Sequence, residues 1–367
     1  MKIAHICNNY VSSKVHLELI KSISKNSGND QYVYVPVRSK KFIDVNRVDD
    51  FEIKYFNYSF DILKYFPLIK ILINFIAFIL YGFHKKGQVV IAHNFWSDGV
   101  LAFFNYIFFK KPYILVVRNT DINVFIPKLK HYHWLMALMI KNSHSLVFVN
   151  KSYMRIFEEK YNYLYNKSKR IELIYNGVNE FWLQEFEYDE KRINNSLIYV
   201  GSFNKNKNIQ GIVEACDKVF KRRPDLQLYL VGGNIKDLKS LLNIDVIPPY
   251  IHVLGKIDEK EKLLKLYKKS MIFIMPSFLE TFGLVYVEAL LQGCSIIHSK
   301  GQGIDGIFYE DFIKAVDPKD ISEIAEKIVY LLDTFDKNVT SSEFYSLLKN
   351  LFDWNIIAQQ YLRILEN

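Results

Sequence analysis

The feature that most constrains the fold is an alternation of short apolar runs with amphipathic stretches, which occurs in two series along the chain. Short apolar runs closed by turn residues favour buried strands of a parallel sheet, and the stretches between them favour crossover helices. The first series predicts strands near residues 2–7, 31–37, 88–93, 112–117, 144–149 and 171–175. The second series predicts strands near residues 196–200, 226–231, 250–254, 271–275 and 294–298. This order predicts two doubly wound α/β domains.

The two series are joined by a polar, charged stretch at residues 176–195, after which the pattern restarts. We therefore expect one domain at residues 1–178 and a second at residues 179–352. A last helix, at about residues 353–367, follows the completed second sheet. Trp354 near its start is the residue expected to anchor it.

One strand and the helix after it carry the most informative polar residues. The run from Met271 to Met275 predicts a buried strand, and Gly283 allows a close turn into a helix. The free N–H groups at a helix start attract an anion. Glu280 at the mouth of this helix and Glu288 two turns further on could grip hydroxyl groups on either side of a bound phosphate. The alternative is that Glu280 only favours the helix start and that Glu288 is solvated.

The same stretch resembles a known family signature, with the two glutamates separated by seven residues and followed by Gly293. The matching pattern is Pro276-Ser277-x-x-Glu280-x-Phe282-Gly283-Leu284-x-x-x-Glu288-Ala289. It is similar to retaining glycosyltransferases of family 4. The resemblance implies the GT-B architecture, in which two Rossmann-like domains face a central cleft. It also implies that the first domain binds the acceptor, that the second binds a nucleotide sugar, and that the terminal helix crosses back to the first domain. A helix that caps its own domain is the alternative.

The resemblance also assigns donor-side roles. It implies that Glu288 binds the ribose hydroxyls and that Glu280 contacts the donor sugar. The diphosphate would be held by Lys207, Lys205, Ser202 and the amides of Phe282, Gly283 and Leu284. Ser202 stands where the family usually has arginine, and the alternative for both lysines is a solvated loop. Gly255 and Lys256 would lie beside the nucleotide base.

In the first domain, the segment from Arg118 to Asp121 resembles the family's His-Gly-x-Asp segment, with arginine in place of histidine. Asp121 matches, and Arg118 could supply fixed positive charge to the leaving phosphate. Glu280, Arg118 and Asp121 therefore form the expected catalytic set. Lys14, His16 and His93 are candidates for acceptor binding. Lys14 and His16 could equally be helix surface, and His93 could be structural.

Charge and composition restrict the partners. The formal net charge is +9, with +13 in residues 1–172 and −4 in the remainder. A basic first half attracts anionic lipid or phosphorylated acceptors, and the absence of any recognition-helix, zinc-finger or RNP-type pattern disfavours nucleic acid. Residues 60–82 are strongly apolar but are interrupted by Pro67, which predicts a buried helix or, as the alternative, an interfacial helix rather than a membrane span.

The remaining signals concern compartment and cofactors. Cys7, Cys216 and Cys294 show no metal-ligand spacing, and no leader precedes the first predicted strand. We therefore expect a reduced cytoplasmic protein, active without a metal or cofactor, that contacts the inner face of the membrane through its first domain.

The predicted function is retaining transfer of a hexose-type sugar from a nucleotide diphosphate donor, with UDP favoured, to a glycan or lipid-linked acceptor in surface polysaccharide synthesis. The alternatives are a GT-B epimerase or phosphorylase, or a silent partner that binds a nucleotide sugar without transferring it.

Overall fold

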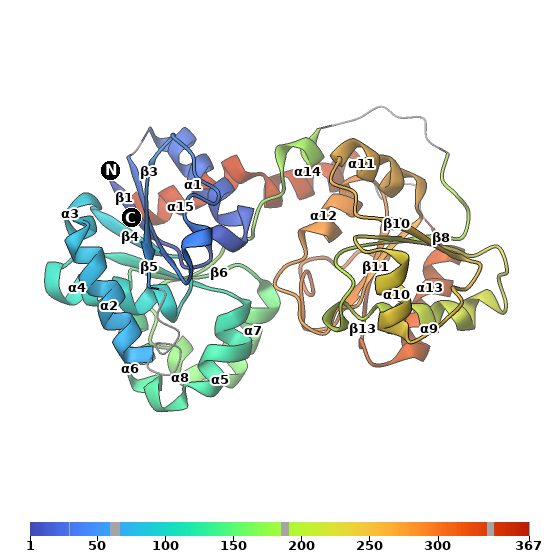
Figure 1. The fold of residues 1–367 in the computed structure, drawn as a ribbon, viewed down its shortest axis with the longest axis horizontal. Coiled ribbons are helices and arrows are strands. Elements are labelled where there is room, and N and C mark those ends of the chain that lie inside the picture. The colour runs from blue at the N-terminus through green and yellow to red at the C-terminus, as the bar shows by residue number, and fades with distance from the viewer. Residues whose placement is uncertain (29, 59–66, 185–190, 336–340, 367) are drawn as a thin grey trace. The chain divides into compact units, whose positions relative to one another are not determined.

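The computed structural model describes residues 1–28, 30–58, 67–184, 191–335 and 341–366, which form two compact units. Unit 1 consists of residues 1–177 together with the returning segment 354–367, and unit 2 consists of residues 178–353. Each unit is built around its own parallel sheet with helices between the strands (Figure 1). The α/β class and the GT-B type of fold predicted from the sequence are thereby confirmed.

Unit 1 contains a seven-stranded parallel sheet in the order β3-β2-β1-β4-β5-β6-β7. The strands are β1 (Ile3–Ile6), β2 (Gln31–Val37), β3 (Glu52–Asn57), β4 (Val89–Ala92), β5 (Tyr113–Val117), β6 (Ser145–Phe148) and β7 (Ile171–Leu173). Sequence patterns predicted all of these except β3, which lies at the sheet edge and is only partly buried. The strand order reverses between β1 and β4, which is where ligands bind in open α/β sheets.

The two faces of this sheet bury different helices, because successive side chains of a strand point to opposite faces. Ile3 and Ile91 pack toward α1 (Lys14–Ser27) and α15 (Trp354–Glu366). Ala4 and Ala92 pack in the cluster formed with α2, α4, α6 and α7. The helices that contribute to this cluster include α2 (Pro67–Leu80), α3 (Phe83–Lys86), α4 (Ser97–Phe109), α6 (His133–Asn142), α7 (Lys151–Lys160) and α8 (Asn162–Tyr165).

The returning helix α15 is bonded into unit 1 at both ends. The Ser22 hydroxyl donates to the Trp354 carbonyl oxygen at 2.8 Å, and a ring nitrogen of His144 lies 2.8 Å from the Ile364 carbonyl oxygen. A Cβ atom on Gly177 would lie 2.5 Å from the Trp354 ring, so glycine is needed where the chain passes this indole. The helix runs beside α1 (Figure 1).

The apolar segment at residues 60–82 differs from the favoured prediction of a buried helix. Residues 59–66 lie outside the described part of the chain, and α2 begins at Pro67, where a proline is tolerated because the first N–H has no helical partner. One side of α2 is buried through residues such as Phe75 and Phe78. The opposite side exposes Ile69, Leu72, Ile76 and Leu80, with Leu80 78% exposed. Within the described residues, no helix combines the length and the hydropathy that a membrane crossing requires.

Unit 2 contains a six-stranded parallel sheet in the order β10-β9-β8-β11-β12-β13. Its strands are β8 (Ser196–Val200), β9 (Gln227–Val231), β10 (Ile251–Gly255), β11 (Ile272–Met275), β12 (Ser295–Ser299) and β13 (Ile313–Val316). Its helices are α9 (Ile209–Phe220), α10 (Ile235–Leu242), α11 (Lys260–Lys269), α12 (Leu284–Leu291), α13 (Ile321–Asp333) and α14 (Ser342–Phe352). The short edge strand β13 and the helix α14 were not predicted. The order reverses between β8 and β11, so a second switch point lies at the centre of this sheet.

Candidate functional site

The loops after β8 and β11 are held together at the switch point of unit 2. The Asn206 side chain accepts a hydrogen bond from the Leu279 N–H at 3.0 Å and donates to the Leu279 carbonyl oxygen at 2.9 Å. The Asn206 carbonyl oxygen also accepts from the Phe278 N–H at 2.9 Å. Three hydrogen bonds from one residue therefore fix the register of two loops that are far apart in sequence.

This clamp places Glu280 beside Lys207. The Lys207 ammonium lies 2.5 Å from Glu280 Oε2, and both side chains are largely enclosed, at 21% and 12% exposure. The other oxygen, Oε1, accepts from the Thr281 N–H at 3.0 Å. The Glu280 main chain is also held, because its N–H donates to the Gln302 side chain at 3.0 Å and its carbonyl oxygen accepts from the Gly303 N–H at 3.2 Å. The structure therefore brings together two residues that the sequence predicted separately.

Helix α12 begins next to this pair and presents main-chain groups there. Its N-cap residue Gly283 has φ +72°, and an added Cβ would lie 2.4 Å from the Tyr286 ring, so glycine is required on both grounds. Among the described residues, no side chain forms a capping hydrogen bond at this helix start. The Phe282 ring is buried against Phe352, with centroids 5.6 Å apart. The side chains of Phe282 and Leu284 are apolar, so at these two residues only the main-chain N–H groups can interact favourably with an anion.

Glu288 is enclosed within unit 2, unlike the solvated helix residue of the alternative interpretation. The buried Tyr267 hydroxyl donates to Glu288 Oε2 at 3.5 Å. Burial raises the pKa of Glu288 to about 7, while the Tyr267 hydrogen bond and the Lys260 ammonium oppose that rise. A carboxylate kept near its titration point at neutral pH is typical of a binding or catalytic group.

Four other residues that the sequence predicted to bind the nucleotide-sugar donor lie away from the Glu280–Lys207 pair or are exposed to solvent. Ser202 is exposed, and its hydroxyl accepts from the Asn204 side chain at 2.8 Å, whereas Lys205 is exposed on the same loop. Gly255 ends β10, which is separated from β11 by β9 and β8. Lys256 pairs with Asp258 at 2.8 Å and is 75% exposed.

In unit 1, Asp121 is enclosed by main-chain donors at the end of β5. Its carboxylate accepts from the N–H groups of Phe95, Trp96 and Arg118 at 3.0–3.1 Å, and the residue is fully buried. Burial raises the pKa of Asp121 to about 6, against the lowering effect of these hydrogen bonds and of the Arg118 charge. This geometry suits a group that holds the loop after β4 against the loop after β5.

The guanidinium of Arg118 is held by other partners than Asp121. Arg118 Nε donates to the His93 carbonyl oxygen at 2.8 Å, and Nη1 donates to the Asn176 side chain at 3.3 Å. The side chain is 93% buried, since its exposure is 7%, yet Nη2 has no hydrogen-bond partner among the described residues. A buried donor without a partner is costly, and a ligand oxygen would satisfy it.

The predicted acceptor residues separate into exposed and buried ones. Lys14 is exposed at the start of α1. His16 is 2% exposed and therefore does not form helix surface, and His93 is fully buried. Their rings contact each other, with centroids 5.1 Å apart.

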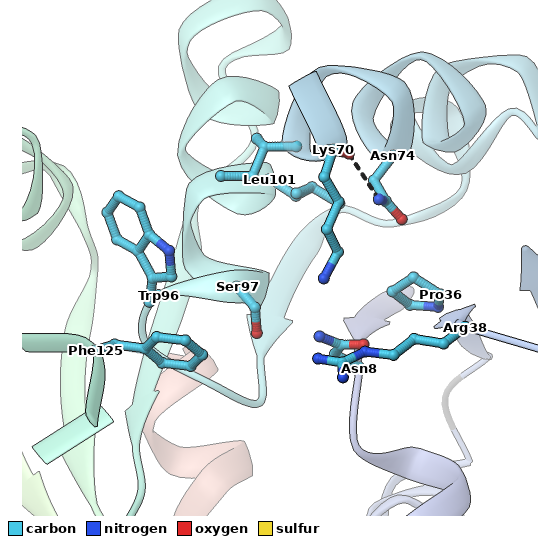
Figure 2. Close-up of a pocket in the computed structure, with 10 residues that line it drawn as sticks. Asn8, Pro36, Arg38, Lys70, Asn74, Trp96, Ser97, Leu101 and Phe125 are labelled. Carbon is cyan, nitrogen blue, oxygen red and sulfur yellow. Dashed lines mark hydrogen bonds between the residues drawn. The ribbon is translucent and has the colours of Figure 1, made fainter. Parts of the chain in front are cut away.

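A pocket of about 210 Å³ lies in unit 1 beyond the ends of β1 and β2. Figure 2 shows the Lys70 ammonium and the Arg38 guanidinium directed into it, opposite Ser97 at the start of α4. Apolar walls come from Pro36, Ile71, Leu101, Trp96 and Phe125. Sequence reasoning missed this site, although Arg38 is the first charged residue after a buried strand and stands at the edge where ligands bind.

Known proteins resemble both the sequence and the fold. Residues 180–340 match the family model for glycosyl transferases group 1. The chain is 26% identical over 240 residues to an uncharacterized glycosyltransferase of Methanocaldococcus jannaschii, covering 60% of this chain and 59% of that protein. It is 24% identical over 182 residues to the phosphatidyl-myo-inositol mannosyltransferase of Mycobacterium tuberculosis, covering 47% of each. The matched region thus spans about half the length of these curated relatives.

Among solved structures, the chain resembles the sucrose-phosphate synthase of Thermosynechococcus elongatus with a TM-score of 0.72. The match covers 99% of this chain and 98% of that one, at 17% sequence identity. At this identity the likeness concerns the fold, which extends over both units.

Proposed function

Because residues 180–340 match the family model for glycosyl transferases group 1, we propose that this chain is a retaining enzyme that moves a hexose-type sugar from a UDP-sugar to a glycan or lipid-linked acceptor. The setting we propose is the cytoplasmic face of the membrane, during synthesis of a surface polysaccharide. The observation that carries the proposal is the Lys207–Glu280 pair beside the start of α12, at the switch point of the unit 2 sheet.

The charges and hydrogen-bonding groups of that arrangement match those of a nucleotide diphosphate sugar. Lys207 and the N–H groups at the start of α12 can meet the diphosphate without a metal ion at that position. Glu280 can accept hydrogen bonds from sugar hydroxyls, and Glu288 can accept them from the ribose. In unit 1, the unsatisfied Nη2 group of Arg118 is the group that we expect to meet negative charge that develops on the substrate.

For the acceptor, we propose an anionic headgroup bound in the pocket of unit 1. Arg38 and Lys70 provide two cations there, and the start of α4 provides oriented N–H groups. Next to the pocket, α2 exposes Leu72 and Ile76, and α2 contacts α4, which in turn contacts α6. These helices also expose Phe108 and Trp134, at 66% and 63%. An exposed apolar face beside cationic groups suits insertion at the surface of an anionic membrane.

The donor assignment predicts that affinity for UDP-sugars depends on the ionisation of Glu288. Below a pKa of about 7 the carboxyl is neutral, and above it the carboxylate accepts two hydroxyl hydrogens, so wild-type affinity should rise between pH 6 and pH 8. Glu288→Gln should weaken binding by about 1.5–3 kcal/mol at pH 8 and remove this pH dependence. Calorimetric titration with a panel of nucleotide sugars measures both effects and identifies the base.

Stability provides the matched control for this experiment. The folded-state pKa of Glu288 is raised above its ordinary value, so the stability of the wild type falls as pH rises from about 4.5 through 7. Glu288→Gln should therefore melt at a higher temperature than wild type at pH 8 while binding the donor less tightly. Unchanged affinity across the panel, in a variant with this raised melting temperature, would exclude Glu288 from the donor site.

The membrane assignment predicts salt-sensitive binding to anionic vesicles. Leu72→Ser with Ile76→Ser should reduce binding to phosphatidylglycerol vesicles at least about tenfold, because each half-exposed side chain contributes roughly 1 kcal/mol of apolar burial. Leu347→Ser on α14 of unit 2, where the leucine is 40% exposed, is the control and should bind as wild type. Sedimentation with anionic and neutral vesicles tests this. Equal binding to both vesicle types, or equal loss in the two variants, would contradict a membrane face on α2.

A further inference from the structure

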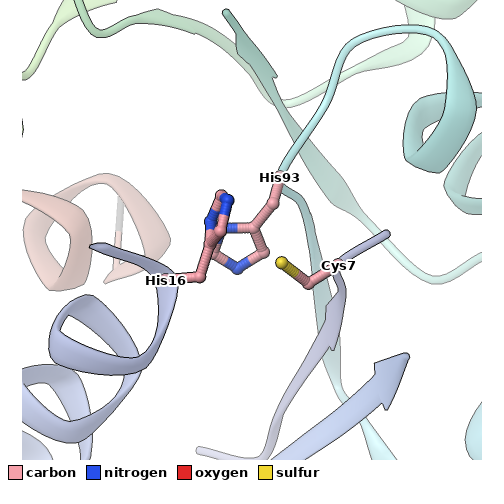
Figure 3. A group of neighbouring side chains, drawn as sticks. All are labelled: Cys7, His16 and His93. Atoms are coloured by element: carbon pink, nitrogen blue, oxygen red, sulfur yellow. The ribbon is translucent and has the colours of Figure 1, made fainter. Parts of the chain in front are cut away.

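Three side chains of metal-ligand type converge in unit 1 from distant parts of the sequence. Cys7 directly follows β1, His93 directly follows β4, and His16 lies in the first turn of α1. Figure 3 shows their side chains turned toward one another, and one ligand atom from each lies within 4.8 Å of the others. All three residues are buried, with exposures of 0–2%. They lie outside the donor site, which is in unit 2.

The spacing of the nitrogen atoms fits a bound cation. His16 Nδ1 and His93 Nδ1 lie 3.4 Å apart. Two imidazole nitrogens bound at ~2.0–2.1 Å to one tetrahedral Zn²⁺ ion are separated by about 3.4 Å, and a thiolate at ~2.3 Å lies about 3.6 Å from each nitrogen. The 4.8 Å limit on the present group therefore requires the Cys7 sulfur to move by no more than about 1 Å.

A second observation concerns the groups that orient the His93 ring. His93 Nε2 lies 3.0 Å from His5 Nδ1, and His5 Nε2 lies 2.7 Å from Gln31 Oε1. The amide oxygen can only accept, so His5 carries its proton on Nε2 and accepts at Nδ1 from His93. That leaves the lone pair of His93 on Nδ1, which is the atom facing His16. Metal-binding histidines are generally supported in this way, by an acceptor on the other ring nitrogen.

The protonation states are also compatible with a cation. Metal binding uses the neutral form of an imidazole, and burial of His16 and His93 lowers their pKa in the direction that favours this form. Burial and the nearby Asp98 carboxylate raise the pKa of the Cys7 thiol, so a bound cation must displace one proton. The buried Asp98 carboxylate acts on Cys7 and can balance part of the added positive charge, whereas the Arg118 guanidinium acts on all three side chains and opposes it.

We propose that Cys7, His16 and His93 form a binding site for a transition-metal cation of zinc type, with His5 and Gln31 as its supporting groups. Such an ion ties the loop after β1 to the end of β4 and to the first turn of α1. Asn8, which follows Cys7 directly, lines the cationic pocket, so the ion would fix one wall of that pocket. Thiolate and imidazole are ligands that suit Zn²⁺, and three protein ligands leave one position for a water molecule.

Cobalt substitution tests the site independently of sugar transfer. The full chain, treated with a chelator and titrated with Co²⁺, should bind one equivalent and show a thiolate-to-cobalt charge-transfer band together with intense visible bands of a tetrahedral ion. Zn²⁺ should displace the cobalt and raise the melting temperature. Cys7→Ser should abolish the charge-transfer band. His5→Phe, which removes the supporting acceptor and leaves all three ligands, should weaken Co²⁺ binding about 10–100-fold.

The other free cysteine residues provide matched controls. Cys216 is buried in unit 2 like Cys7 in unit 1, and Cys216→Ser should retain the cobalt spectrum unchanged. Circular dichroism of Cys7→Ser, compared with wild type, checks that the variant is folded. The proposal is overturned if the folded wild type binds no stoichiometric Co²⁺ or Zn²⁺, or if the charge-transfer band survives in Cys7→Ser. Donor binding in unit 2 should be retained in either case, which separates this result from the proposed transferase function.

Discussion

Replacing Lys207 by methionine is expected to lower kcat/KM for the sugar donor about 10²–10³-fold, because one preorganised charge is removed from the developing diphosphate. Methionine keeps most of the apolar stem and removes the ammonium. Glu280→Gln is expected to lower kcat as well, since the amide still accepts from the Thr281 N–H but loses the charge that polarises the sugar hydroxyls. Steady-state kinetics with a saturating acceptor measure both effects.

The double variant separates catalysis from folding. Lys207→Met leaves the largely enclosed Glu280 carboxylate without its cation, so this single variant should lose stability. Adding Glu280→Gln removes that penalty, and the double variant should regain melting temperature but no activity. Lys221→Met, at an exposed lysine just after the C-terminal end of α9 in the same unit, is the control and should remain close to wild type. Recovery of activity together with stability would show that the pair is only structural.

Arg118→Ala is expected to lower kcat more strongly than it lowers donor affinity, because the value of its charge increases as the glycosidic bond breaks. Arg118→Lys should restore little, since an ammonium cannot reproduce the separate bonds of Nε and Nη1 while leaving Nη2 for a ligand. Arg118→His introduces the family's usual residue and should also lose activity, because the His93 and Asn176 contacts here are built around a guanidinium.

A stability measurement on the same variants controls for a merely structural role. Arg118→Ala leaves the Asn176 side chain without a donor, which should cost about 1–3 kcal/mol of unfolding free energy. Asn176→Ala removes the same contact while keeping the guanidinium, so it should lose comparable stability and retain kcat. If Asn176→Ala and Arg118→Ala lower kcat equally, the charge of Arg118 has no separate role in the reaction.

Sequence patterns predicted the positions of the central strands along the chain, because each of these strands is a short apolar run with a turn at its end. They also placed Glu280 next to a helix start, because Gly283 and the apolar strand before it fix that local geometry. Local patterns did not predict the strand at the sheet edge, where fewer side chains are buried. Strand β3 mixes charged and aromatic residues, with every residue at least partly exposed, so it lacks the run that identifies a buried strand.

Contacts between distant segments were the second limit. His16 and Cys7 are close in sequence, but His93 joins them only through the pairing of β1 with β4, in which His5 lies opposite Ile91. The partners of Arg118 come from the ends of β4 and of the segment before unit 2. Helix α2 is a further example of this limit. Its apolar composition indicates a helix, but the side of the helix that stays exposed depends on how the rest of unit 1 packs against it.

The return of α15 to unit 1 also has a consequence for how the protein is made. Ile357, Tyr361 and Ile364 complete the apolar cluster on one face of the first sheet, yet a ribosome adds them only after all of unit 2. During synthesis, the first unit therefore cannot complete its core, because Ile3, Ile91 and Ile114 are not yet packed against α15. The second unit can complete its own core before that helix is added. Domains usually complete folding in the order in which they are synthesised, whereas here the N-terminal unit can complete folding only after the C-terminal unit has been synthesised.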